Sequence, residues 1–109
     1  MGLFDSTAVK ELKKDAGFIG GLIADQALGQ LPPGAADEMV RSESQRDRLL
    51  AVFDSASKEV GAEKALKKAT KEAAYYARMH AELRKVPAGQ LPKTAEAAIL
   101  DMLGRSVSA

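Results

Sequence analysis

Side chains that could bind anions recur along one side of the segment 62–85. Steps of three or four positions place on one helical face Lys64, Lys68, Lys71, Tyr75 and Arg78, and Glu82 and Lys85 continue the row. Cations at this spacing can bind phosphates, and a tyrosine among them can stack on a base. Residues 58–85 hold eight Lys/Arg against four Asp/Glu, although the net charge of the chain is only +1. Three interpretations stay open: a solvated face, a surface for an acidic protein, and a nucleic-acid site.

A row of small side chains in the segment 16–24 is the second candidate. Three glycines within one helix cost about 2–3 kcal/mol relative to alanine, and the close approach of another helix would offset that cost. The neighbouring helix could belong to the same chain or to another subunit. The predicted partner-binding face comprises Ala16, Gly17, Phe18, Gly20, Gly21 and Ala24.

Contact with a membrane surface is a further interpretation of the same segment. Phe18, Ile19, Leu22 and Ile23 could enter an interface beside the basic residues at 13 and 14. The apolar run 16–24 has nine residues, whereas a spanning helix needs about 20. No basic stretch precedes an early apolar run, so we expect no signal peptide. We therefore expect a cytoplasmic protein or a component of an assembled particle.

Catalytic and metal-binding patterns find little support in the sequence. The chain has no cysteine and a single histidine, and no spacing of carboxylates assembles a metal site around that residue, His80. Neither a phosphate-binding loop nor a nucleophile elbow occurs. We expect no enzymatic activity, no cofactor, no metal and no small-molecule substrate. His80 is expected to be a hydrogen-bonded core or interface residue whose charge could make packing sensitive to pH.

Hydrophobic periodicity predicts the elements that position these residues. An apolar stripe at helical spacing predicts a helix over about 7–28, through Val9, Leu12, Ala16, Ile19 and Ile23. A second helix is expected over 35–60, continuous or mildly kinked, because neither Gly nor Pro interrupts it. The third, over 62–85, has an apolar seam of Ala62, Leu66, Ala69, Ala73, Tyr76, His80 and Leu83. A fourth short helix is predicted over 94–103.

The four letters Gly-Gln-Leu-Pro occur twice, at 29–32 and 89–92. The similarity fails upstream, where Phe18 would align with Arg78 and Leu22 with Glu82, so it does not mark a repeated domain. In both places glycine can end a helix and proline prevents its continuation. We interpret the motif as a connector that is used twice.

Together these patterns predict an all-α fold in one domain, a small bundle of about four helices or two helical hairpins with short Gly/Pro connectors. The function favoured is that of a non-enzymatic structural or adaptor protein. It would dock through helix faces onto other protein subunits, of the same or a different chain, in an assembly such as a virion, filament or secretion complex. A small nucleic-acid-binding protein and a peripheral membrane protein are the alternatives.

Overall fold

The computed structural model describes residues 5–108 of the chain, with side chains described as far as Gly104. This part forms five helices and no strand, which confirms the all-α prediction. The helices are α1 (Thr7–Ala27), α2 (Ala35–Arg41), α3 (Glu43–Val60), α4 (Ala62–Leu83) and α5 (Leu91–Ser108).

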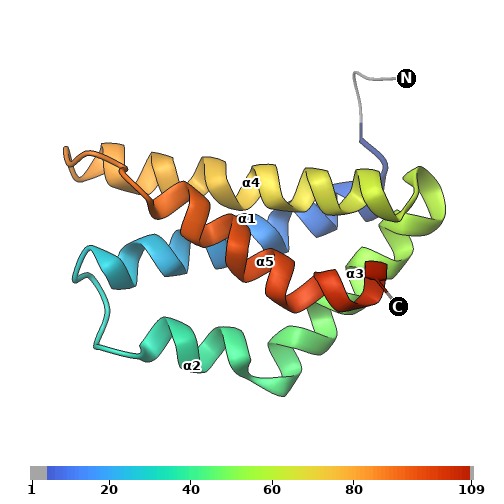
Figure 1. The fold of residues 1–109 in the computed structure, drawn as a ribbon, viewed down its shortest axis with the longest axis horizontal. Coiled ribbons are helices and arrows are strands. Elements are labelled where there is room, and N and C mark those ends of the chain that lie inside the picture. The colour runs from blue at the N-terminus through green and yellow to red at the C-terminus, as the bar shows by residue number, and fades with distance from the viewer. Residues whose placement is uncertain (1–4, 109) are drawn as a thin grey trace.

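The long helices alternate in direction along the chain (Figure 1). Helix α1 runs one way, α2 and α3 return, α4 follows the direction of α1, and α5 returns in front of them. Helices α1 and α4 are therefore parallel. The order of their contacts agrees, because Gly17 meets Tyr76 and, one turn later on both helices, Gly21 meets His80.

The closest approach in the bundle is that of α1 to the backbone of α4. A Cβ atom placed on Gly20 would overlap the carbonyl oxygen of Ala73 and lie 2.7 Å from its Cα. Ordinary helix pairs are 8–10 Å apart because side chains separate them. The missing side chain at position 20 therefore allows α1 and α4 to pack more closely than larger residues would permit.

The buried face of α4 differs from the seam that the sequence predicts. Its core side is a stripe of fully buried alanines, Ala65, Ala69, Ala73, Ala77 and Ala81. Of the predicted seam, Ala69 and Ala73 are buried, whereas Leu83 is 68% exposed. The predicted seam followed spacing alone, whereas α4 packs against α1, α3 and α5 at once, and a stripe of alanines allows this.

The predicted helix 35–60 is broken at Ser42. Ser42 adopts an extended conformation (φ −62°, ψ 143°), and its hydroxyl oxygen accepts a hydrogen bond from the Gln45 amide, which starts α3. Serine is a favoured N-cap, so it can end one helix and begin the next without Gly or Pro. Helix α2 starts at Ala35 after Gly34, which provides no side-chain cap. Gln26 of α1 supplies one, because its Oε1 accepts from the Ala36 amide at 2.7 Å.

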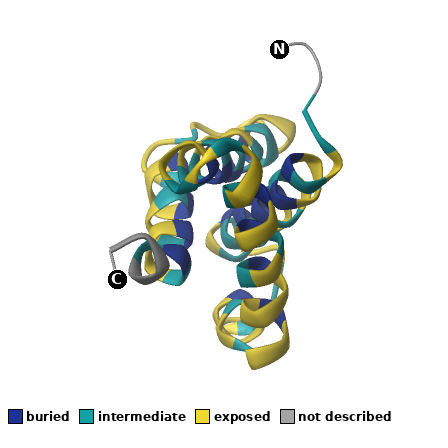
Figure 2. Cartoon of the chain, turned by 90° about the vertical axis from the view of Figure 1, so that its right-hand side faces the viewer, coloured by how far each residue is buried: buried dark blue, intermediate teal, exposed yellow. Residues whose placement is uncertain are grey.

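The core lies where α1, α3, α4 and α5 meet. Its largest fully buried side chains are Val9, Leu12, Ile19, Leu49, Ile99 and Leu103. Figure 2 shows the buried residues on the inward sides of the helices and the exposed ones outside. Helix α5 begins before the predicted Thr94 and continues beyond 103. Among the described helices, none combines the length and hydropathy needed to cross a bilayer.

Candidate functional site

The small-residue face of α1 is occupied by the chain's own helices. Gly17, Gly20 and Gly21 are buried and lie against Tyr76, Ala73 and His80 of α4. Ala16 and Ala24 are likewise fully buried. The structure thus corrects the predicted partner-binding face, because only Phe18 of its six members remains accessible, at 52% exposure. It also separates the apolar group predicted to enter a membrane, since Ile19 is fully buried in the core.

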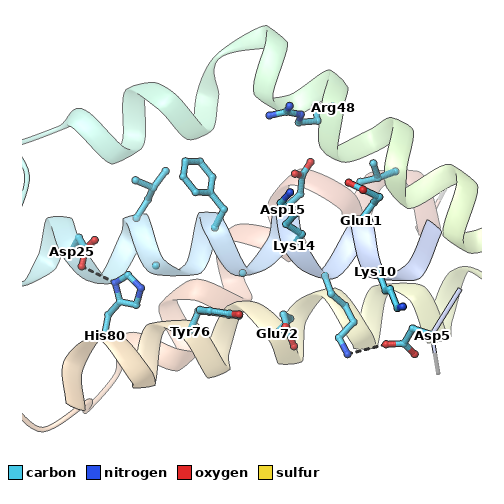
Figure 3. A pocket seen from close by; sticks show the side chains of 16 residues that line it. Asp5, Lys10, Glu11, Lys14, Asp15, Asp25, Arg48, Glu72, Tyr76 and His80 are labelled. Atoms are coloured by element: carbon cyan, nitrogen blue, oxygen red, sulfur yellow. Dashed lines mark hydrogen bonds and ion pairs between the residues drawn. The ribbon is translucent and has the colours of Figure 1, made fainter. Parts of the chain in front are cut away.

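Phe18 lies in an open groove of about 730 Å³ that follows the outer face of α1. The floor is α1 from Lys10 to Asp25, and the walls come from α3 and α4 (Figure 3). That stretch of α1 is roughly 22 Å long, at about 1.5 Å per residue. The groove is therefore about as long as a four-turn helix.

The middle of the groove is apolar. Phe18 and Leu22 rise one helical turn apart from α1, and Val52 faces the groove from α3. Tyr76 lies over Gly17 on the other side, where its ring takes the space that a side chain on Gly17 would need. Leu22, Val52 and Tyr76 are partly exposed, so the groove presents an apolar strip to solvent that no described residue covers.

At one end of the groove, a carboxylate links α1 to α4. Asp5 accepts a hydrogen bond from Lys13 at 2.9 Å and lies 3.5 Å from the ammonium of Lys68. The hydrogen bond from Lys13 lowers the pKa of Asp5, and the same contact raises the pKa of Lys13. At pH values above the ordinary aspartate pKa, this pairing stabilises the fold. The stabilisation is lost as the pH falls and Asp5 becomes protonated.

Asp15 projects toward Arg48 of α3 across the groove (Figure 3). Burial raises the pKa of its carboxyl group, and the positive charge of Arg48 partly counteracts that rise. The Oδ2 atom is buried and has no hydrogen-bond partner among the described residues. Asp15 therefore destabilises the isolated fold when it is ionised.

We expect Asp15→Asn to stabilise the protein near neutral pH by on the order of 1 kcal/mol. A raised pKa means that folding disfavours the ionised form, so the cost to the wild type appears as pH rises above the ordinary aspartate range. Urea unfolding at neutral and acid pH measures the effect, and the gain should vanish in acid. Asp47→Asn, which removes an exposed carboxylate from α3, is the control. A wild type at least as stable as the Asp15 variant at neutral pH would contradict this account.

The opposite end of the groove is closed by an aspartate–histidine pair. Asp25 Oδ1 lies 2.8 Å from His80 Nδ1 (Figure 3). Arg84 approaches the same oxygen at 3.7 Å. An ionised carboxylate only accepts, so Nδ1 carries the proton and donates it. The imidazole also packs against Gly21. His80 is thus a partly buried, hydrogen-bonded residue that joins α4 to α1.

The row of cations on α4 points away from the core. Lys64, Lys71 and Arg78 are exposed, and Tyr75 is 52% exposed. Lys68 is less accessible because it pairs with Asp5. The structure therefore keeps these side chains on one outer face of the bundle, beside the groove and not within it.

Sequence reasoning missed most of the groove. One sequence feature did point to the groove. Phe18 and Leu22 are large apolar residues four positions apart, and both fall outside the buried stripe of α1. Val52 and Arg48 could not be assigned to the same site, because only the packing of α3 on α1 brings them there. Asp5, Asp15 and Asp25 carried no spacing signal at all.

The chain matches no family model, and no match was found among curated proteins or solved structures. Within the described residues, no group of three or more His, Asp or Glu side chains could hold a metal ion.

Proposed function

We propose that this protein is a non-enzymatic adaptor that docks into a larger protein assembly by receiving an amphipathic helix in the groove over α1. The half-exposed Phe18 is the single observation that carries the proposal. Folding leaves this ring at the centre of an elongated hollow with Leu22 and Val52 beside it. A contiguous apolar strip with a charged border is typical of an interaction site.

The walls of the groove favour a helix as the occupant. All three lining elements are helices, whose backbone groups are already paired within each helix. An extended segment buried here would leave its own backbone donors and acceptors without partners. A helix satisfies these groups internally and would present apolar residues at i, i+3, i+4 and i+7 to the strip.

The border of the groove sets the polar requirements of the partner. Lys10, Lys14 and Arg48 lie at one end together with Glu11 and Asp15. Because the border carries both signs, the edges of the incoming helix should also carry both. Lys10 and Lys14 are exposed and close to the apolar strip, so acidic residues beside the partner's apolar face would suit them.

A photo-cross-linking phenylalanine analogue at position 18 tests the proposal in cells that produce the protein. We expect covalent adducts whose cross-linked segments, mapped by mass spectrometry, have apolar residues at helical spacing. Phe18→Glu in the unlabelled protein should remove the same partner from affinity capture, because a charge would be buried in the strip.

Tyr75 provides the matched control, since it has the same exposed fraction as Phe18, 52%, but lies on the outer face of α4. The analogue at position 75 should not yield these adducts, and Tyr75→Glu should retain the partner. Recovery of an identical set of proteins by the Phe18→Glu and wild-type chains would contradict the proposal.

A further inference from the structure

We infer that the outer face of α4 binds single-stranded nucleic acid, with phosphates on its lysines and arginine and one base stacked on Tyr75. The face comprises Lys64, Lys68, Lys71, Tyr75 and Arg78 and spans roughly 21 Å of helix. None of these five residues lines the groove, so this inference does not rest on the proposed adaptor function.

The burial pattern of α4 shows that no described element covers this face. The fully buried alanines at 65, 69, 73, 77 and 81 point into the bundle. The cationic row lies on the other side of the same helix, as its exposure shows. Glu72, the nearest acid in sequence to Lys71, instead lines the groove. Between Lys64 and Arg78, the outward row is therefore cationic with one aromatic.

The chemistry of the face favours nucleic acid over an acidic protein. Protein–protein interfaces have a core that is depleted of charge and rich in apolar area. Here the only large apolar group in the row is Tyr75, so a protein would find no apolar centre to bury. Interfaces with nucleic acid are polar and strongly positive, as this face is.

Tyr75 is held in a position suited to stacking. Its ring makes an edge-to-face contact with Tyr76, with centroids 5.4 Å apart and planes at 89°. Tyr76 in turn packs on Gly17 of α1, so the pair is supported by the bundle. Half of the Tyr75 side chain remains open to solvent. A supported, exposed ring among cations favours a single strand, whose bases are free to stack, over a duplex.

Asp5 acts as an internal competitor for one cation of the row. Its carboxylate lies 3.5 Å from Lys68, where a phosphate would otherwise be attracted. Binding of a strand along the whole row must displace it from Lys68. Removing the charge of Asp5 should therefore raise the affinity, which is an effect that a purely structural ion pair would not have.

Fluorescence anisotropy with an oligodeoxythymidine of about 15 nucleotides tests the inference. With four phosphate contacts, the slope of log K against log salt should be about −3, and Lys64→Gln with Lys71→Gln should reduce it to about −1.4. Tyr75→Leu should weaken binding at least about fivefold. Asp5→Asn should strengthen it, and Phe18→Glu should leave it unchanged.

Lys58→Gln with Lys93→Gln is the matched control, because these exposed lysines lie on α3 and α5, away from the row. A flat salt response, or an equal loss in the control variant, would overturn the inference. Equal affinity for a duplex of the same length would overturn the stacking role of Tyr75. Equal affinity for polyglutamate would assign the face to an acidic protein instead.

Discussion

Gly20→Ala is expected to destabilise the protein by about 2 kcal/mol, although alanine is the better helix former by about 1 kcal/mol. The added methyl group would overlap the backbone of Ala73, which cannot move aside as a flexible side chain could. Helices α1 and α4 would have to separate, and their neighbours would lose contacts as well. Gly20→Leu should cost more than about 3 kcal/mol for the same reason.

Gly104→Ala is the matched control for this prediction. A Cβ atom at position 104 of α5 would meet no atom of the described residues within 4 Å. The same substitution should therefore stabilise the protein by about 0.5–1 kcal/mol through helix propensity alone. Urea unfolding followed by circular dichroism measures both variants. If Gly20→Ala stabilised the protein as Gly104→Ala does, α1 would not approach α4 as described.

Ile19→Ala is expected to cost about 2–5 kcal/mol, whereas Phe18→Ala should cost less than about 1 kcal/mol. Ile19 is fully buried in the core, and Phe18 is 52% exposed in the groove. These adjacent residues therefore lie on different faces of α1, Ile19 in the core and Phe18 in the groove. Truncating Ile19 leaves a cavity, whereas the space around Phe18 is already open to water.

Thermal and urea unfolding of the two alanine variants provide the measurement. Their comparison also bears on the adaptor proposal, because a residue retained for binding can be removed at little cost to the isolated fold. If Phe18→Ala were as destabilising as Ile19→Ala, the ring would belong to the core, and the groove would not be an open docking surface.

The two proposed surfaces would allow one small bundle to join two partners. The groove lies between α3 and α4 over α1, and the cationic row lies on the outer face of α4. Lys68 and Asp5 lie where the surfaces meet, since Asp5 also lines the groove.

Much of the helical architecture follows from local rules that the sequence displays. The stripe from Val9 to Ile23, with Ser6 as its N-cap, is sufficient to predict α1. Gly61, with φ of 92°, is a one-residue link between α3 and α4, and its glycine was a visible signal. The cationic face of α4 was also readable, because a spacing of three and four fixes which side chains share a helix face.

Other features depend on contacts between residues distant in sequence. The glycines of α1 indicated a close neighbour, but nothing local specified that it would be α4 of the same chain. The core side of α4 was predicted only in part: Ala69 and Ala73 are buried as expected, but Leu83 is exposed. The buried stripe continues through Ala77 and Ala81 instead. The break at Ser42 is different, because it depends on a local cap: the Ser42 hydroxyl accepts from the Gln45 amide, and the prediction overlooked it because neither Gly nor Pro marks the position.

The sequence by itself determined that the chain is helical, where most helices lie and which charges share one face of α4. These properties depend on periods of three to four residues and on capping groups, which act within a few positions. Only the tertiary structure decided that the glycines of α1 are buried within the chain and that Phe18, Val52 and Asp15 share a groove. Such pairings depend on how whole helices pack, and no local pattern specifies which faces will meet.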